Sequence, residues 1–123
     1  MKFKQGVSIR GLREEMHFAL RQIDVAATYM PIAYEATCTS AVDGKHSSTS
    51  LHYDGRALDI RTRDLKPVVI RDERWDANDL KNCFVEHIKI RLSTDYDVVL
   101  EDDHIHIEWQ PKRTAYNERN KRL

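Results

Sequence analysis

The sequence predicts an α+β domain, in which helices pack on one face of a small antiparallel sheet. Two segments have apolar residues at helical spacing, and several short segments between and after them have the character of strands. The predicted order is helix, strand, loop, strand, helix and hairpin. Runs of this kind favour helices that cover one side of a sheet over a parallel sheet with helices on both sides.

The first predicted helix covers residues 12–30. Gly11 precedes it and Pro31 follows it, and both residues suit helix boundaries. Its apolar side chains recur at steps of three and four, which is one face of an α-helix. They are Leu12, Met16, Ala19, Leu20, Ile23, Ala26, Ala27 and Met30.

The central part of the chain is predicted to alternate between strands and polar loops. Residues 32–38 read as a strand, and the Ser-, Thr-, Asp-, Gly- and His-rich segment 39–55 reads as a long loop. Residues 57–61 form a second short strand, with Asp59 inside it. Residues 63–75 are charged and contain a proline, so we expect a loop around their short apolar stretch.

A second helix is predicted over residues 76–92 and a hairpin after it. Asp76 is a suitable N-cap, and Asp79 follows three positions later. The apolar residues of this helix step by four, at Leu80, Phe84, Ile88 and Leu92. Residues 96–100 and 104–109 then read as two strands joined by a tight acidic turn.

Composition limits the classes of protein that the chain can belong to. Its 123 residues suit one domain, which we place at 1–110, followed by a basic tail at 111–123. The chain has 20 basic and 20 acidic residues, so no overall charge favours nucleic acid or a membrane as partner. Two cysteines exclude a disulfide framework and a cysteine-rich zinc finger. We expect a monomer.

The tail and the N-terminus bear on where the protein acts. The tail has five basic residues and one acidic residue, which is typical of a solvated tail or of an arm that binds an anionic polymer. The basic N-terminus has no apolar segment behind it, and no apolar run is long enough for a membrane span. We therefore expect synthesis in a cytoplasm without a signal peptide.

Histidines and one aspartate form the strongest chemical pattern. Asp59 lies on a predicted strand, and Gly55 permits a sharp turn that returns His52 to its side. His104 and His106 alternate with isoleucines on the last strand, so both histidines point to one face. Two histidines and one aspartate would make a three-ligand zinc site with an open position. Surface histidines, or an ordinary hydrogen bond between histidine and carboxylate, would explain the same residues.

The spacing of these residues is similar to that of a known family. Ser50-x-His52-x-x-Gly55-x-Ala57-x-Asp59, followed by Asp103-x-x-His106, resembles the M15 zinc peptidases, which include D-alanyl-D-alanine carboxypeptidases and phage L-alanyl-D-glutamate endopeptidases. The segment 43–60 looks even closer to the Hedgehog signalling domain, which shares that fold. The resemblance covers residues 10–110 and implies a fold of the Hedgehog/DD-peptidase type.

The resemblance also implies roles for individual residues. His52, Asp59 and His106 would be the zinc ligands, and Asp103 would be the catalytic carboxylate. In Hedgehog domains the equivalent acid lies farther upstream, so that Glu101 or Asp102 could take this part.

Three further residues have implied roles. His46 and His104 match histidines near the Hedgehog metal, and Ser50 would orient a ligand. The family usually has an arginine in the strand before the loop, but residues 35–40 contain none. His46 or His104 could replace it, and the absence argues against a strict carboxypeptidase.

The expected function is that of a zinc-dependent peptidase that cuts an amide bond in the stem peptides of peptidoglycan, as a phage or bacterial enzyme that acts on the cell wall. Asp103 at the peptidase spacing favours an enzyme. A zinc-containing binding module of the Hedgehog kind that does not hydrolyse, or a zinc-stabilised structural domain of a virion, would be the alternatives.

Overall fold

The computed structural model describes residues 1–42, 52 and 54–111. Within this part the chain is an α+β protein with two helices, a five-stranded sheet and a separate two-stranded sheet. The helices are α1 (Glu14–Thr28) and α2 (Ala77–Arg91). The strands are β1 (Lys2–Phe3), β2 (Thr37–Ser40), β3 (Ala57–Arg61), β4 (Val68–Ile70), β5 (Glu73–Trp75), β6 (Tyr96–Leu100) and β7 (His104–Trp109).

The larger sheet is mixed, which corrects the predicted antiparallel sheet. Its strand order is β1-β2-β3-β7-β6, and the pairings from β2 to β6 are antiparallel as predicted. β1 instead joins the edge of β2 in parallel, with Lys2 opposite Thr37. This two-residue strand is too short for a period-two pattern, so no local pattern predicts it.

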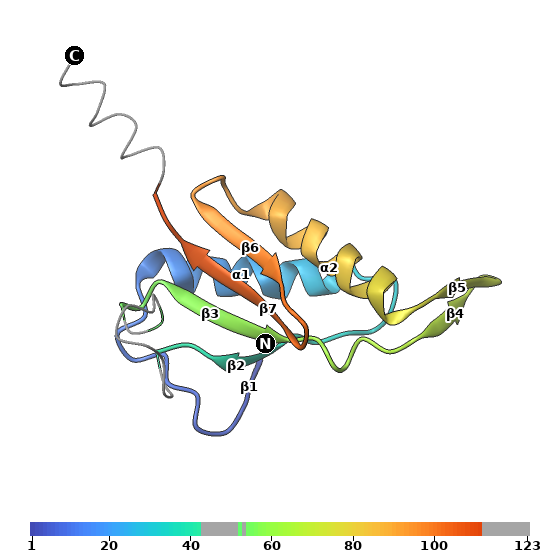
Figure 1. Ribbon diagram of the computed structural model, residues 1–123, viewed down its shortest axis with the longest axis horizontal. Helices are drawn as coiled ribbons and strands as arrows, with labels where there is room; N and C mark the ends of the chain where they lie inside the picture. Colours follow the sequence, from blue (N-terminus) through green and yellow to red (C-terminus); the bar gives the residue numbers. More distant parts are fainter. Residues whose placement is uncertain (43–51, 53, 112–123) are drawn as a thin grey trace, which may run out of the picture.

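Both helices pack on one face of the sheet and leave the other face to the site (Figure 1). On the helix side, Leu58 and Ile60 of β3 are fully buried, and so are Ile105 and Ile107 of β7. Successive side chains of a strand point to opposite faces, so the residues between these apolar ones lie on the side without helices. The core side chains of the helices include Met16, Ile23, Leu80, Phe84 and Ile88.

The predicted strand at 32–38 is wrong for its first five residues, since β2 begins only at Thr37. The alternating apolar residues Ile32, Tyr34 and Ala36 do pack against the core, which explains the period-two pattern. β3 pairs with this part of the chain only from Cys38 onward, and residues 32–36 belong to no strand. Core packing therefore produced the alternating pattern of a strand outside the sheet.

The predicted loop at 63–75 is also wrong, because it contains the hairpin of β4 and β5. Arg71 and Asp72 form its two-residue turn, with φ angles of 50° and 66°. Such turns prefer Asn-Gly or Asp-Gly, and an Arg-Asp pair gives little sequence signal. The hairpin extends beyond the edge of the larger sheet at one end of the molecule (Figure 1).

The two predicted helices, the strand at 57–61 and the final hairpin are confirmed within a few residues, whereas most of the predicted loop at 39–55 lies outside the described residues. Asp76 caps α2 as expected: its carboxylate accepts the N–H of Asp79 at 2.8 Å, and the Asp79 carboxylate accepts the N–H of Asp76 at 2.9 Å. β6 and β7 form the predicted hairpin. No helix among the described residues is long and apolar enough to cross a bilayer. Most of the predicted basic tail, residues 112–123, lies outside the described residues.

Candidate metal centre

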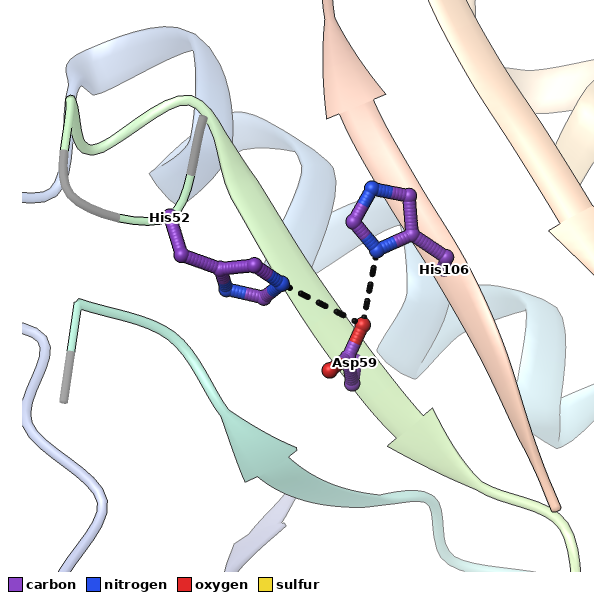
Figure 2. A group of neighbouring side chains, drawn as sticks. All are labelled: His52, Asp59 and His106. Carbon is purple, nitrogen blue, oxygen red and sulfur yellow. Dashed lines mark hydrogen bonds and ion pairs between the residues drawn. The ribbon is translucent and has the colours of Figure 1, made fainter. Parts of the chain in front are cut away.

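Three side chains from separate parts of the chain meet on the sheet face without helices (Figure 2). Asp59 of β3 and His106 of β7 are direct partners in the strand register, and Nδ1 of His106 lies 2.8 Å from Oδ1 of Asp59. His52 approaches from the loop before β3, with Nε2 at 3.5 Å from the same oxygen. One ligand atom from each of the three lies within 4.8 Å of the others. The group could therefore hold a metal ion.

A tight turn returns His52 to β3. The N–H of Gly55 donates to the carbonyl of His52 at 3.1 Å, and Gly55 has a φ of 70°. A Cβ at this position would collide with the carbonyl oxygen of Gly11, so the close approach requires glycine as much as the positive φ does. Arg13 fastens the turn further, because its Nε donates to the carbonyl of Asp54 at 3.0 Å.

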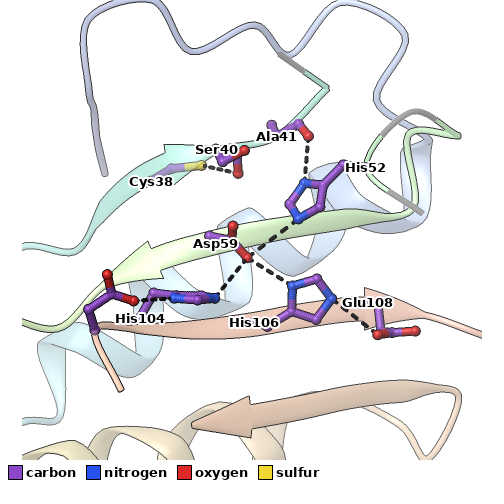
Figure 3. Close-up of polar contacts among 9 residues, drawn as sticks. Cys38, Ser40, Ala41, His52, Asp59, His104, His106 and Glu108 are labelled. Carbon is purple, nitrogen blue, oxygen red and sulfur yellow. Dashed lines mark hydrogen bonds and ion pairs between the residues drawn. The ribbon is translucent and has the colours of Figure 1, made fainter. Parts of the chain in front are cut away.

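The outward nitrogen of each histidine has an acceptor as its partner (Figure 3). Nδ1 of His52 lies 2.7 Å from the carbonyl oxygen of Ala41, and Nε2 of His106 lies 3.1 Å from Oε1 of Glu108. A carbonyl or a carboxylate can only accept, so these ring nitrogens carry the protons. Gln110 donates to the other oxygen of Glu108 and holds that carboxylate in place.

These outer hydrogen bonds determine which ring nitrogen of each histidine has a lone pair toward Asp59. In the neutral rings, Nε2 of His52 and Nδ1 of His106 have lone pairs that point toward the Asp59 carboxylate. Two lone pairs and an anion at such short range require a cation between them, either a proton or a metal ion. Metal-bound histidines in proteins usually donate their other N–H to a carbonyl or carboxylate, as His52 and His106 do. The donor set therefore fits a metal.

The electrostatics of the metal-free chain agree with this geometry. Burial raises the pKa of Asp59, but the hydrogen bonds from His106 and His52 outweigh it and bring this pKa far below its usual value. The hydrogen bond to Asp59 raises the pKa of His106 against the opposing effect of burial, and Glu108 raises it further. The short contact between Nδ1 of His106 and Oδ1 of Asp59 therefore stabilises the charged forms of both side chains.

His104 and Asp103 form a pair beside this group. Nδ1 of His104 lies 2.6 Å from Oδ1 of Asp103, and its Nε2 lies 3.7 Å from Oδ1 of Asp59. The Asp103 side chain is 89% exposed, and its hydrogen bond with His104 lowers its pKa. Asp103 thus reaches the group through His104, which has its inner nitrogen toward Asp59 (Figure 3).

The structure brings together His52, Asp59, His104 and His106, and it places Asp103 at their edge. His46 and Ser50 lie outside the described residues. Sequence reasoning missed Glu108 and the carbonyl of Ala41. Glu108 had a signal, since it continues the alternation of His104 and His106 on one face of β7. The carbonyl had none, because every residue carries one.

No protein-family model matches the chain, and no curated protein is similar to it in sequence. The site geometry and the motif resemblance are the grounds for a functional proposal.

Proposed function

We propose that this chain is a zinc-dependent peptidase of the M15 type, with a Hedgehog/DD-peptidase fold, which hydrolyses an amide bond in peptidoglycan stem peptides. The observation that carries the proposal is the inward-facing set of His52, Asp59 and His106 with the His104–Asp103 pair next to it. The spacing of these residues, which resembles that of the M15 peptidases, supports the same assignment. A phage or bacterial origin and action on the cell wall belong to the proposal.

The residues of the chain have distinct parts in this reaction. His52, Asp59 and His106 would hold zinc, which is a Lewis acid and lowers the pKa of a bound water to about 7. Asp103 accepts a hydrogen bond from Nδ1–H of His104, which leaves the lone pair of His104 Nε2 on the side of Asp59. There Nε2 can accept the proton of the attacking water. The carboxylate also stabilises the imidazolium that results, and Nε2 can then return the proton to the leaving amine.

The test is mass spectrometry of muropeptides released from purified peptidoglycan, with and without a chelator. The expected result is a new set of stem-peptide fragments that the chelator abolishes. Zinc content by elemental analysis should be about one ion per chain for a single three-ligand site. His106→Ala should lose zinc and fragments together. Iron in place of zinc would overturn the peptidase assignment, because two histidines and a carboxylate also serve non-haem iron enzymes.

Asp103→Asn separates the peptidase from a zinc-containing binding module. The substitution should lower turnover by at least ~10²-fold, the usual contribution of acid–base catalysis, while zinc content stays unchanged. Asp72→Asn removes an exposed carboxylate from the turn of the β4–β5 hairpin and serves as the control. Zinc-loaded protein that hydrolyses no peptidoglycan would leave the Hedgehog-like binding module as the function.

A further inference from the structure

An apolar stripe runs along the solvent-facing side of α1 and ends at its C-cap. It consists of Phe18, Val25 and Tyr29, whose exposed fractions are 41%, 42% and 61%. Their spacing places them on one side of the helix, opposite to core residues such as Met16 and Ile23. Single exposed apolar residues are common, but the outer face of a helix that only covers a sheet is usually polar. The stripe therefore indicates a contact surface.

The two ends of this stripe differ in charge. Glu14 and Glu15 lie in the first turn of α1, and neither forms an ion pair within the described residues. At the other end, the guanidinium of Arg91 from α2 lies 4.5 Å from the centre of the Tyr29 ring and donates to the carbonyl of His87 at 2.8 Å. The His87 ring also stacks on Tyr29. One end is therefore acidic, and the other has a cation held beside an aromatic ring.

A hollow of about 550 Å³ lies at the acidic end of the stripe. The hydroxyl of Tyr96 donates to the carbonyl of Glu15 at 2.7 Å and so fixes one wall of this hollow to α1. Aromatic side chains that enter pockets are frequent anchors of protein interfaces. The hollow can therefore receive an aromatic ring that has a cation beside it. Its lining residues are Glu14, Glu15, His17, Phe18, Arg21 and Tyr96.

We propose that the outer face of α1 is a dimer interface, on which a second copy of this chain packs antiparallel about a two-fold axis. The axis passes midway between Phe18 and Val25, so Phe18 contacts Val25 of the partner subunit. Glu14 and Tyr29 lie equally far on either side of the same midpoint. Tyr29 of the partner subunit therefore reaches the hollow and brings Arg91 of the partner subunit to Glu14. Two-fold symmetry makes each contact twice.

Charge favours the antiparallel dimer over a parallel one. A parallel pair would bring the two acidic ends together and the two Arg91 side chains together, and like charges repel. The antiparallel pair joins opposite charges at both ends. Because the helices cover the sheet face opposite to Asp59 and His106, both metal groups stay accessible in this dimer (Figure 1). Such a dimer differs from the monomer expected from the sequence, and it does not depend on the proposed function.

The test is sedimentation equilibrium of the full chain at concentrations around the micromolar, where small interfaces dissociate. Wild type should be a dimer at the high end of this range and a monomer at the low end. Phe18→Gln/Val25→Gln removes the apolar centre at exposed helix positions and should stay a monomer throughout. Val69→Gln replaces an exposed apolar residue on the β4–β5 hairpin and should dimerise as wild type does.

Charge reversal tests the orientation of the two copies. Glu14→Arg and Arg91→Glu should each raise the dissociation constant of the homodimer about tenfold or more, because like charges then meet twice in every dimer. An equimolar mixture of the two variants should dimerise nearly as well as wild type, since both contacts of the mixed dimer again join opposite charges. Mixing would not rescue a substitution that only damages the fold.

Three results would overturn the inference: a wild type that is a monomer at every concentration, a dimer that Phe18→Gln/Val25→Gln leaves intact, or charge variants whose mixture dimerises no better than either variant alone. These outcomes are separate from the proposed function, because oligomeric state is measured without substrate. A dimer that cuts no peptidoglycan would keep the interface and remove the peptidase, whereas a monomer with chelator-sensitive cleavage would do the reverse.

Discussion

Glu108 should control how tightly the chain binds zinc, although it is not a ligand. Its Oε1 accepts the Nε2 proton of His106 at 3.1 Å, and only 20% of its side chain is exposed. This hydrogen bond fixes the ring so that Nδ1 keeps its lone pair toward Asp59. Glu108→Ala removes the acceptor, after which His106 can rotate or can place its proton on the nitrogen that must bind the metal.

The size of the effect follows from one charge-assisted hydrogen bond. Such bonds contribute about 1.5–3 kcal/mol, and about 1.4 kcal/mol corresponds to a tenfold change in affinity. We therefore expect Glu108→Ala to weaken zinc binding roughly 10- to 100-fold, as for other outer partners of metal-bound histidines. Glu108→Gln keeps an acceptor but loses the charge, and it should weaken binding by no more than about tenfold.

The assay is competition for zinc with a chromophoric chelator at constant pH and salt. Asp97→Asn is the matched control, since Asp97 lies opposite Glu108 in the register of β6 and β7 and its loss removes one charge from the same face. The control should change zinc affinity much less than Glu108→Ala does. Equal affinities for Glu108→Ala and wild type would refute the reasoning, and equal losses in Glu108→Ala and Asp97→Asn would show that charge alone matters.

Three further outcomes are expected. Gly55→Ala should lower the urea midpoint and zinc affinity more than Gly6→Ala does. Gly55 and Gly6 both have a positive φ, which costs about 1–2 kcal/mol in other residues, but only at Gly55 would the new Cβ collide with backbone. Equal losses in the two variants would contradict this expectation. Burial raises the pKa of Tyr34 to about 12. The stability that this shift contributes is complete below pH ~10 and is lost as the pH rises toward 12, with an upper limit of about 2.7 kcal/mol that partial exposure reduces. Between pH 10 and 12, the free energy of unfolding in urea should fall less for Tyr34→Phe than for wild type. If the two proteins lost the same unfolding free energy over this range, the result would count against the burial of the phenol. The raised pKa of His106 favours a proton on the ring, which zinc would have to displace, so the calorimetric heat of zinc binding at pH 7 should depend on the ionisation enthalpy of the buffer. A heat that is the same in all buffers would contradict this expectation.

Local patterns explain the parts of the fold that the sequence predicted. The two helices, the α2 cap and the β6–β7 hairpin each have their signal within one segment, as periodicity, as the Asp76–Asp79 pair or as a tight turn. The approach of Asp59 and His106 was predictable for a similar reason. Each lies among buried apolar residues on its strand, so both side chains had to leave the core on the same side.

The features that the sequence did not predict depend on contacts between segments that are distant in the chain. The pairing of β1 with β2 joins residues at opposite ends of the first helix, and nothing local to Lys2–Phe3 indicates it. Residues 32–36 have the alternating packing of a strand but belong to none. Lys4, Arg61 and Arg63 line a hollow beside Asp59 and His104, and only the tertiary structure brings Lys4 to the two arginines. Residues 35–40 contain no arginine, and this absence does not predict that cations from other segments lie beside Asp59 and His104.

The alternation of side chains on β3 and β7 has a consequence for substitutions at the site. Asp59, His104, His106 and Glu108 all project from the sheet face opposite the hydrophobic core, and the residues between them fill that core. Substitutions at these four partly exposed positions should therefore disturb the core less than substitutions of the buried residues between them. His52 is different, because it is buried with an exposed fraction of 4%. Loss of the His52 ring would leave its buried space empty, so a change at this position alters packing as well as chemistry.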